Sequence, residues 1–247
     1  MKIFFHQKFT KRAKVFSIIR WPILFFPILG WAGIHFIHIP KTGGLTISAL
    51  LDSHYKSEEI YPHRDAGQLA RNTYDKNMMT EVLRAFPPLN RKLTIGHFPF
   101  WFFQNKDPHF ETSYIFTVLR DPVERVISSY FYQGEKEKKL NSPLDVIPNR
   151  MCKMLCSDVS LRGEALLEDC IQNLKKMSFL IFMDDFEEGI RRLFRRLELG
   201  PCPLIPHRNS SHKMAISQEL IEEIKKANEL DVRLYEYASQ NLRYKSY

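Results

Sequence analysis

The chain has 247 residues, of which 44% are hydrophobic and 26% charged, and its 36 basic and 28 acidic residues give a formal net charge of +8. Its length and composition suit one globular domain, and the lack of internal repeats or low-complexity tracts excludes repeat and disordered proteins. Six basic residues and no acidic residue lie within positions 1–20, which leaves 30 basic against 28 acidic residues elsewhere. The charge excess therefore does not indicate a basic face for nucleic acid or another polyanion.

A basic N-terminal stretch leads into a hydrophobic segment that ends near Gly33. This segment approaches the roughly 20 apolar residues needed to cross a bilayer, but Arg20 and two prolines interrupt it. We expect residues 1–33 to lie on a membrane surface, with the basic end on the cytoplasmic side. The alternatives are a type II signal-anchor of a Golgi membrane protein and an arm packed on the domain. Residues 34–247 are expected to form that domain.

The first predicted strand, 34–39, ends at a turn that contains a lysine and two glycines, His-Ile-Pro-Lys-Thr-Gly-Gly at 38–44. The proline cannot donate a ladder hydrogen bond, so it ends the strand. Gly43 and Gly44 allow backbone N–H groups to approach an anion, and the helix predicted next points its positive end at the same place. Lys41 adds a mobile positive charge. The segment therefore predicts a phosphate-binding turn.

The phosphate-binding loop of nucleoside triphosphatases is the nearest alternative, and it has the pattern G-x-x-x-x-G-K-[ST]. Here the lysine precedes the glycines, and the sequence contains no Gly-Lys pair. A metal-dependent triphosphatase is therefore not expected.

A second predicted strand begins at Leu93 and ends in Gly96-His97, and an aromatic cluster, 98–103, follows it. Histidine titrates near neutral pH, so a general base and a structural residue at the strand end both fit His97. Core packing accounts for most of the aromatic cluster. Trp101 is a candidate for stacking on a sugar ring.

A third predicted strand, 114–119, ends at a second polar turn. Asp121 suits a helix N-cap and Pro122 the first helical position, so a helix is predicted to begin there. Arg120 precedes this helix and Ser128 lies two turns inside it. A guanidinium and a hydroxyl group in this arrangement can hold a phosphate through charge-assisted hydrogen bonds.

The C-terminal part continues the alternation of strands and helices, with a strand at 179–183, a polar loop at 207–213 and one final helix at 217–239. This alternation predicts an α/β fold with a mainly parallel central sheet flanked by helices. The cysteines are expected to be free and mostly buried. A zinc site built from Cys152, Cys156, His207 and His212 is the alternative, although its spacing exceeds that of zinc fingers.

The two turns, taken together, resemble the 5′-phosphosulfate loop and the 3′-phosphate strand and helix of sulfotransferases that use 3′-phosphoadenosine 5′-phosphosulfate (PAPS). Within that superfamily they most resemble the carbohydrate-type group that includes heparan sulfate 2-O-sulfotransferase. Residues 40–46 match the pattern P-K-T-G-G-T-[ST], except that Leu45 replaces the first threonine, and residues 119–128 match L-R-D-P-x-x-R-x-x-S throughout. The resemblance implies a P-loop-like fold.

The resemblance also implies roles for individual residues. Lys41 and His97 are expected to be catalytic, and no metal is expected. The expected donor contacts are Lys41, Thr42, Gly43, Gly44, Thr46, Arg120, Ser128, Ser211 and Lys213. The acceptor is expected to be a hydroxyl group, on a carbohydrate or glycolipid. A nucleotide-dependent phosphotransferase and a non-catalytic, membrane-attached binding protein of the same fold are the alternatives.

Overall fold

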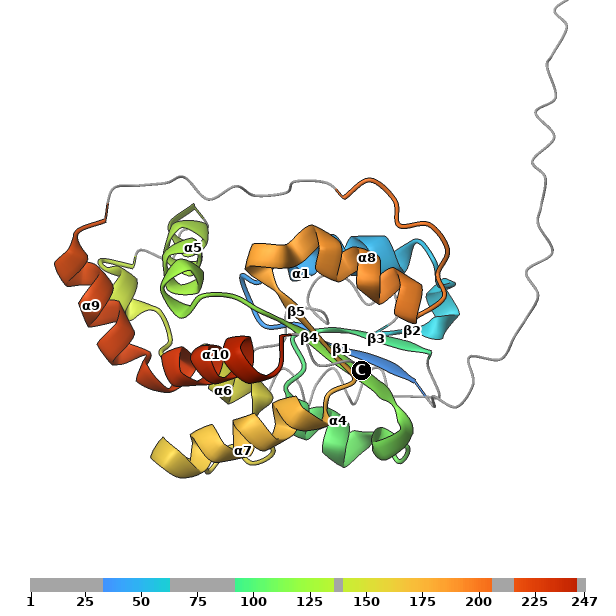
Figure 1. Ribbon diagram of the computed structural model, residues 1–247, viewed down its shortest axis with the longest axis horizontal. Coiled ribbons are helices and arrows are strands. Elements are labelled where there is room, and N and C mark those ends of the chain that lie inside the picture. Colours follow the sequence, from blue (N-terminus) through green and yellow to red (C-terminus); the bar gives the residue numbers. More distant parts are fainter. Residues whose placement is uncertain (1–32, 63–91, 136–139, 206–215, 244–247) are drawn as a thin grey trace, which may run out of the picture.

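The computed structural model describes residues 33–62, 92–135, 140–205 and 216–243. Its centre is a five-stranded parallel sheet in the order β2-β3-β1-β4-β5 (Figure 1). The strands are β1 (Ile34–Ile37), β2 (Ile60–Tyr61), β3 (Leu93–Gly96), β4 (Tyr114–Leu119) and β5 (Phe179–Phe182). The predicted α/β fold, with a parallel sheet flanked by helices and a P-loop-like strand–turn–helix unit, is confirmed.

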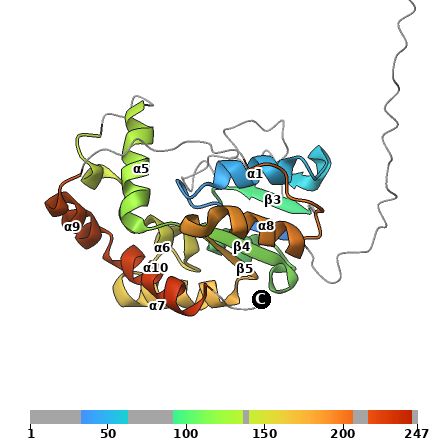
Figure 2. The ribbon, with the colours of Figure 1, turned by 45° about the horizontal axis from the view of Figure 1, so that its top comes forward.

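Helices cover both faces of the sheet, and two further helices lie beyond one end of it (Figures 1 and 2). The helices are α1 (Gly44–Asp52), α4 (Phe100–Lys106), α5 (Pro122–Glu135), α6 (Arg150–Leu155), α7 (Gly163–Lys176), α8 (Phe186–Arg196), α9 (Gln218–Ala227) and α10 (Glu229–Asn241). Short 3-10 segments occupy Ser57–Glu59, Phe110–Thr112, Pro143–Asp145 and Met183–Asp185. Helices α1 and α8 pack on one face, whereas α4, α6, α7 and α10 pack on the other.

The side chains of β4 show how the sheet supplies both cores. Tyr114, Phe116 and Val118 belong to the core under α1 and α8. Ile115 and Leu119 belong to the core under the other helices. Successive residues of a strand point to opposite faces, so a strand covered on both sides has no polar alternation. The continuous apolar runs in the sequence reflect this burial.

The predicted final helix at 217–239 is in fact two helices, so that prediction was wrong. Asn228 separates α9 from α10 and has non-helical backbone angles. Its side-chain amide donates to the Ile224 carbonyl oxygen at 3.0 Å, and its side-chain oxygen accepts a hydrogen bond from the Asn149 N–H at 3.0 Å. The Ile224 carbonyl oxygen also accepts from the Asn228 N–H at 3.0 Å, so the side chain adds a bond at the end of α9, and the bond from Asn149 ties this break to the start of α6. Strands β1 and β5 also end earlier than predicted, by two residues and one residue.

The predicted membrane segment lies outside the described residues, apart from residue 33, so membrane attachment stays a prediction. In the described ranges, no helix is both long enough and apolar enough to cross a bilayer.

The cysteines are free thiols, as predicted: Cys152, Cys156 and Cys170 are buried, and Cys202 is half-buried. Among the residues that the structure describes, no group of three or more His, Cys, Asp or Glu residues is placed to hold a metal ion. The histidines of the alternative zinc site lie outside those residues.

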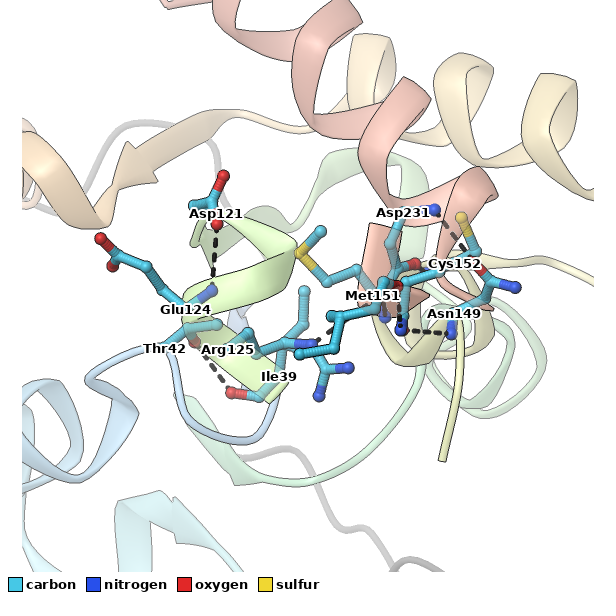
Figure 3. A network of polar contacts seen from close by, with 11 residues as sticks. Ile39, Thr42, Asp121, Glu124, Arg125, Asn149, Met151, Cys152 and Asp231 are labelled. Atoms are coloured by element: carbon cyan, nitrogen blue, oxygen red, sulfur yellow. Dashed lines mark hydrogen bonds and ion pairs between the residues drawn. The ribbon is translucent and has the colours of Figure 1, made fainter. Parts of the chain in front are cut away.

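A buried ion pair connects α5 to the C-terminal part of the chain (Figure 3). Arg125 of α5 is 1% exposed and Asp231 of α10 is fully buried, and the Arg125 Nε lies 3.9 Å from a carboxylate oxygen of Asp231. The same carboxylate accepts hydrogen bonds from the backbone N–H groups of Met151, at 2.9 Å, and Cys152, at 2.8 Å. Burial lowers the pKa of Arg125, and the charge of Asp231 opposes that shift. One carboxylate therefore fixes α5, α6 and α10 together.

Replacing Asp231 by Asn is expected to lower the free energy of unfolding by about 3 kcal/mol, because it leaves the buried Arg125 charge uncompensated. Urea unfolding monitored by circular dichroism measures this. Glu164→Gln is the control: it breaks the exposed ion pair of Glu164 with Arg233, which solvent screens, so the loss of stability should be much smaller. Equal losses in the two variants would contradict a special role of the buried pair.

Candidate functional site

The candidate site lies at the carboxyl edge of three neighbouring strands. In the parallel register, Ile37 at the end of β1 pairs with Gly96 of β3 on one side and with Thr117 of β4 on the other. The Thr117 hydroxyl donates a 2.7 Å hydrogen bond to the Ile37 carbonyl oxygen. Residues that follow these strands therefore meet at one edge, which is where open α/β sheets bind ligands. His38 and His97 are the next residues after β1 and β3.

The turn after β1 has an unusual backbone conformation. Lys41 has a φ of 70° and Gly43 a φ of 77°, both in the left-handed region. This region is uncommon for residues with a Cβ atom, so the surroundings must stabilise Lys41 in it. The Thr42 side chain is buried, and its hydroxyl donates to the Ile39 carbonyl oxygen at 2.8 Å. The Thr42 hydroxyl proton is therefore engaged in a hydrogen bond within the turn.

Packing explains why glycine occupies two consecutive positions of this turn. A Cβ atom on Gly43 would lie 2.6 Å from the Phe186 ring, and one on Gly44 would lie 2.0 Å from the His38 ring. The sequence suggested only that these glycines let an anion approach. The structure adds that neighbouring rings fill the space beside them. Helix α1 begins at Gly44, and Thr46 is buried in its first turn.

The turn after β4 forms as predicted and contacts the first turn. The Asp121 carboxylate accepts a 3.0 Å hydrogen bond from the Glu124 N–H and caps α5. Arg120 Nε lies 3.3 Å from a carboxylate oxygen of Glu124, and Arg120 Nη1 donates to the Lys41 carbonyl oxygen at 3.2 Å. Ser128 is 7% exposed on α5. The structure therefore brings the Lys41 and Arg120 turns into direct contact, while their contacts with a donor stay a prediction.

The sequence analysis missed a contact between Lys41 and an aromatic ring. The Lys41 ammonium lies 3.9 Å from the centre of the Tyr132 ring. Tyr132 is four residues after Ser128 on α5, and residues at this spacing share a helix face. This spacing was the one signal in the sequence that could have indicated the contact between Lys41 and Tyr132.

His97 is held by a hydrogen bond that determines which ring nitrogen carries the proton. Its Nδ1 lies 2.7 Å from the His38 carbonyl oxygen. A carbonyl oxygen only accepts, so Nδ1 must donate and Nε2 keeps its lone pair. The His38 ring stacks on the His97 ring with centroids 4.0 Å apart. In this tautomer, Nε2 is the nitrogen that can take up a proton.

The pKa of His97 is lowered to about 4: burial is the main cause, the hydrogen bond to the His38 carbonyl opposes it, and the charge of Arg150 adds to the lowering. Burial, His97 and the Lys41 charge hold the pKa of His38 well below its usual value. Both rings are therefore neutral at neutral pH. Arg150 is the first residue of α6, and no motif in the sequence indicated that it would lie near His97.

The remaining predicted residues divide into two groups. Ser211 and Lys213 lie outside the described residues, so their contacts with a donor stay a prediction. The phenylalanines that follow His97 are buried in the core, and Trp101 is partly buried against it, which confirms core packing for that cluster.

The fold is similar to two solved structures that have low sequence identity to this chain. A sulfotransferase from Alicyclobacillus acidocaldarius is 15% identical, with a TM-score of 0.44, over 84% of this chain and 96% of that one. Mouse sulfotransferase SULT7A1, solved as a complex with PAP, is 12% identical, with a TM-score of 0.39, over 79% of this chain and 63% of that one. No curated protein matches the chain.

A family model described as the sulfotransferase family matches residues 30–238. The match includes both turns and the histidine pair. The chain therefore belongs to the sulfotransferase family.

Proposed function

We propose that this protein transfers the sulfuryl group of PAPS to a hydroxyl group of a carbohydrate or glycolipid. The observation that carries the proposal is the convergence of three groups at one sheet edge. These are the Lys41 turn, the Arg120 turn bonded to it, and a neutral histidine at the end of the neighbouring strand. The carbohydrate acceptor rests on the resemblance of the two motifs to the carbohydrate-type group.

Each of the two turns binds one end of the donor. Arg120 and Ser128 hold the 3′-phosphate, because a guanidinium before the helix and a hydroxyl two turns inside it can donate charge-assisted hydrogen bonds to a phosphate. The N-terminus of α1, with Lys41, holds the 5′-phosphosulfate through backbone N–H groups and a positive charge. The 3′-phosphate contact distinguishes PAPS from ordinary adenine nucleotides.

The reaction is an in-line transfer between two oxygens. The bond from sulfur to the bridging phosphate oxygen breaks as a bond from sulfur to the acceptor oxygen forms. Lys41 neutralises the negative charge that develops on the leaving oxygen, and His97 Nε2 takes the proton of the acceptor hydroxyl. The products are a sulfate ester and adenosine 3′,5′-bisphosphate (PAP). Positioning and electrostatics supply the rate enhancement, as in phosphoryl transfer.

Ligand-induced thermal stabilisation tests the donor. PAP at roughly 100 times its Kd should stabilise the protein by about 2.7 kcal/mol, because it binds only the folded state, whereas ATP with Mg²⁺ should give a smaller shift in melting temperature. Arg120→Met should remove most of the PAP effect. Arg191→Met is the matched control, because Arg191 is an exposed residue of α8 that pairs with Glu187. A larger shift with ATP and Mg²⁺ would favour a phosphotransferase.

His97→Gln tests the base. Glutamine can still donate to the His38 carbonyl but cannot take a proton, so we expect turnover to fall at least about 100-fold with PAP binding unchanged. Labelled PAPS and a panel of glycans, lipids and phenols provide the assay. His54→Gln is the control, because His54 also bonds a backbone carbonyl, that of Leu50, in an exposed position. A His97 variant with more than a tenth of the normal turnover would show that another group is the base.

The pH dependence of turnover tests the environment of His97. The active form is neutral, so activity should be constant from pH 8 to about 5 and should fall only as the pH passes below the pKa of about 4. If the base had the ordinary histidine pKa, activity would already have fallen about thirty-fold at pH 5. Because the folded pKa lies below the unfolded one, the fold also loses stability as pH falls from about 6.5 towards 4. Circular dichroism at each pH separates unfolding from titration of the base.

A further inference from the structure

Lys41 is held at both its backbone and its ammonium end by α5 and the turn that precedes it. Its carbonyl oxygen accepts the 3.2 Å hydrogen bond from Arg120, and its ammonium lies 3.9 Å from the centre of the Tyr132 ring. An ammonium within about 6 Å of a ring centre is attracted by the negative face of the ring. One helix and its entry turn therefore restrain the whole residue.

The ring lies beside the proposed donor contacts. Tyr132 follows Ser128 by one helical turn, and side chains four residues apart lie next to each other on the helix surface. The face of α5 that holds the 3′-phosphate in the proposed function therefore also carries the ring that contacts the Lys41 ammonium. The attraction restrains this ammonium beside α5.

A lysine at this position needs such a restraint. The backbone bond to Arg120 fixes the main chain of Lys41 but leaves four rotatable side-chain bonds, at the end of which is a compact and strongly hydrated charge. A catalytic group that is misplaced by about 1 Å can cost on the order of 100-fold in rate. Holding the main chain alone therefore does not place the charge at the leaving oxygen.

We infer that Tyr132 is a positioning residue, whose aromatic face holds the Lys41 ammonium at the leaving oxygen of the donor. The inference rests on the proposed function, because it concerns the lysine that acts on that oxygen. The ring face performs the task and the hydroxyl group does not. Phenylalanine should therefore replace this tyrosine, whereas an aliphatic residue of similar size should not.

Three variants test the inference: Tyr132→Leu, Tyr132→Phe and Tyr130→Leu. Tyr130 is the matched control, because it is a half-buried tyrosine of α5 that packs edge-to-face on Phe131. The assay measures PAP released from PAPS with and without acceptor, and calorimetry gives the Kd of PAP. We expect Tyr132→Leu to lower kcat about tenfold while the KM of PAPS and the Kd of PAP change less than threefold. Tyr132→Phe and Tyr130→Leu should keep kcat within twofold of the wild-type value.

Three kinetic results would overturn the inference. A Tyr132→Leu variant with the kcat of Tyr130→Leu would show that the ring does not affect the lysine. A Tyr132→Phe variant as slow as Tyr132→Leu would assign the effect to the hydroxyl group. A loss of PAP affinity in parallel with kcat would make the tyrosine a donor contact.

A spectroscopic measurement separates this inference from the proposed function. After lysine methylation with ¹³C, the Lys41 resonance is assigned by its absence in Lys41→Arg, and its shift in the wild type should carry the ring-current effect of Tyr132. The resonance should move in Tyr132→Leu and stay in Tyr132→Phe, and an unmoved resonance in Tyr132→Leu overturns the inference without any activity assay. If that shift is present but the wild type neither binds PAP nor consumes PAPS, the proposed function fails, and the positioning role in catalysis fails with it.

Discussion

The hydrogen bond from Arg120 to the carbonyl oxygen of Lys41 joins the two turns on which the site is built. Each turn belongs to a separate strand–turn–helix unit, and the strands β1 and β4 are neighbours in the sheet. Strand pairing and the Thr117 bond to Ile37 already align the strand ends, and the Arg120 bond adds a direct link between the turns themselves. In the proposed function this link fixes the width of the phosphate site. The same bond helps to hold Lys41 in a left-handed conformation that a residue with a Cβ atom otherwise avoids.

The protonation state of the two histidines follows from their burial and from the positive charges near them. Lys41 and Arg150 both act on the histidine pair, and burial acts in the same direction, so the rings of His38 and His97 are neutral. A base with a lowered pKa is a weaker proton acceptor, but it is in its active form over a wide pH range. This suits the proposed reaction, in which the acceptor hydroxyl loses its proton only as its bond to sulfur forms. The hydrogen bond to the His38 carbonyl fixes which nitrogen is available.

The sequence predicted those parts of the structure that depend on neighbouring residues. The buried strands, the cap of α5 by Asp121 and the turn at Lys41 all have local signals, and the structure contains them. The break between α9 and α10 was missed because helix propensity continues through it. At the break, the Asn228 side chain accepts a hydrogen bond from Asn149, which is 79 residues away. Local patterns do not contain such a partner.

The candidate site shows the same division. The motifs indicated that Lys41 and Arg120 follow strand ends, and those strands, β1 and β4, are neighbours in the sheet. The contact of Lys41 with Tyr132 depends on a side-chain conformation, and the influence of Arg150 on His97 depends on where α6 packs. The sequence explained the two glycines by the approach of an anion. Packing adds a second reason, because the rings of Phe186 and His38 occupy the space beside them. These features require three-dimensional neighbours that the motifs do not specify.

The buried pair of Arg125 and Asp231 has a consequence for how the protein is made. Synthesis proceeds from the N-terminus, so the arginine leaves the ribosome well before the aspartate that neutralises it. Until α10 has emerged, the guanidinium of α5 has no buried counter-charge, and the N–H groups at the start of α6 lack their acceptor. Helix α5 therefore reaches its final packing only after α10 has emerged and Asp231 can pair with Arg125.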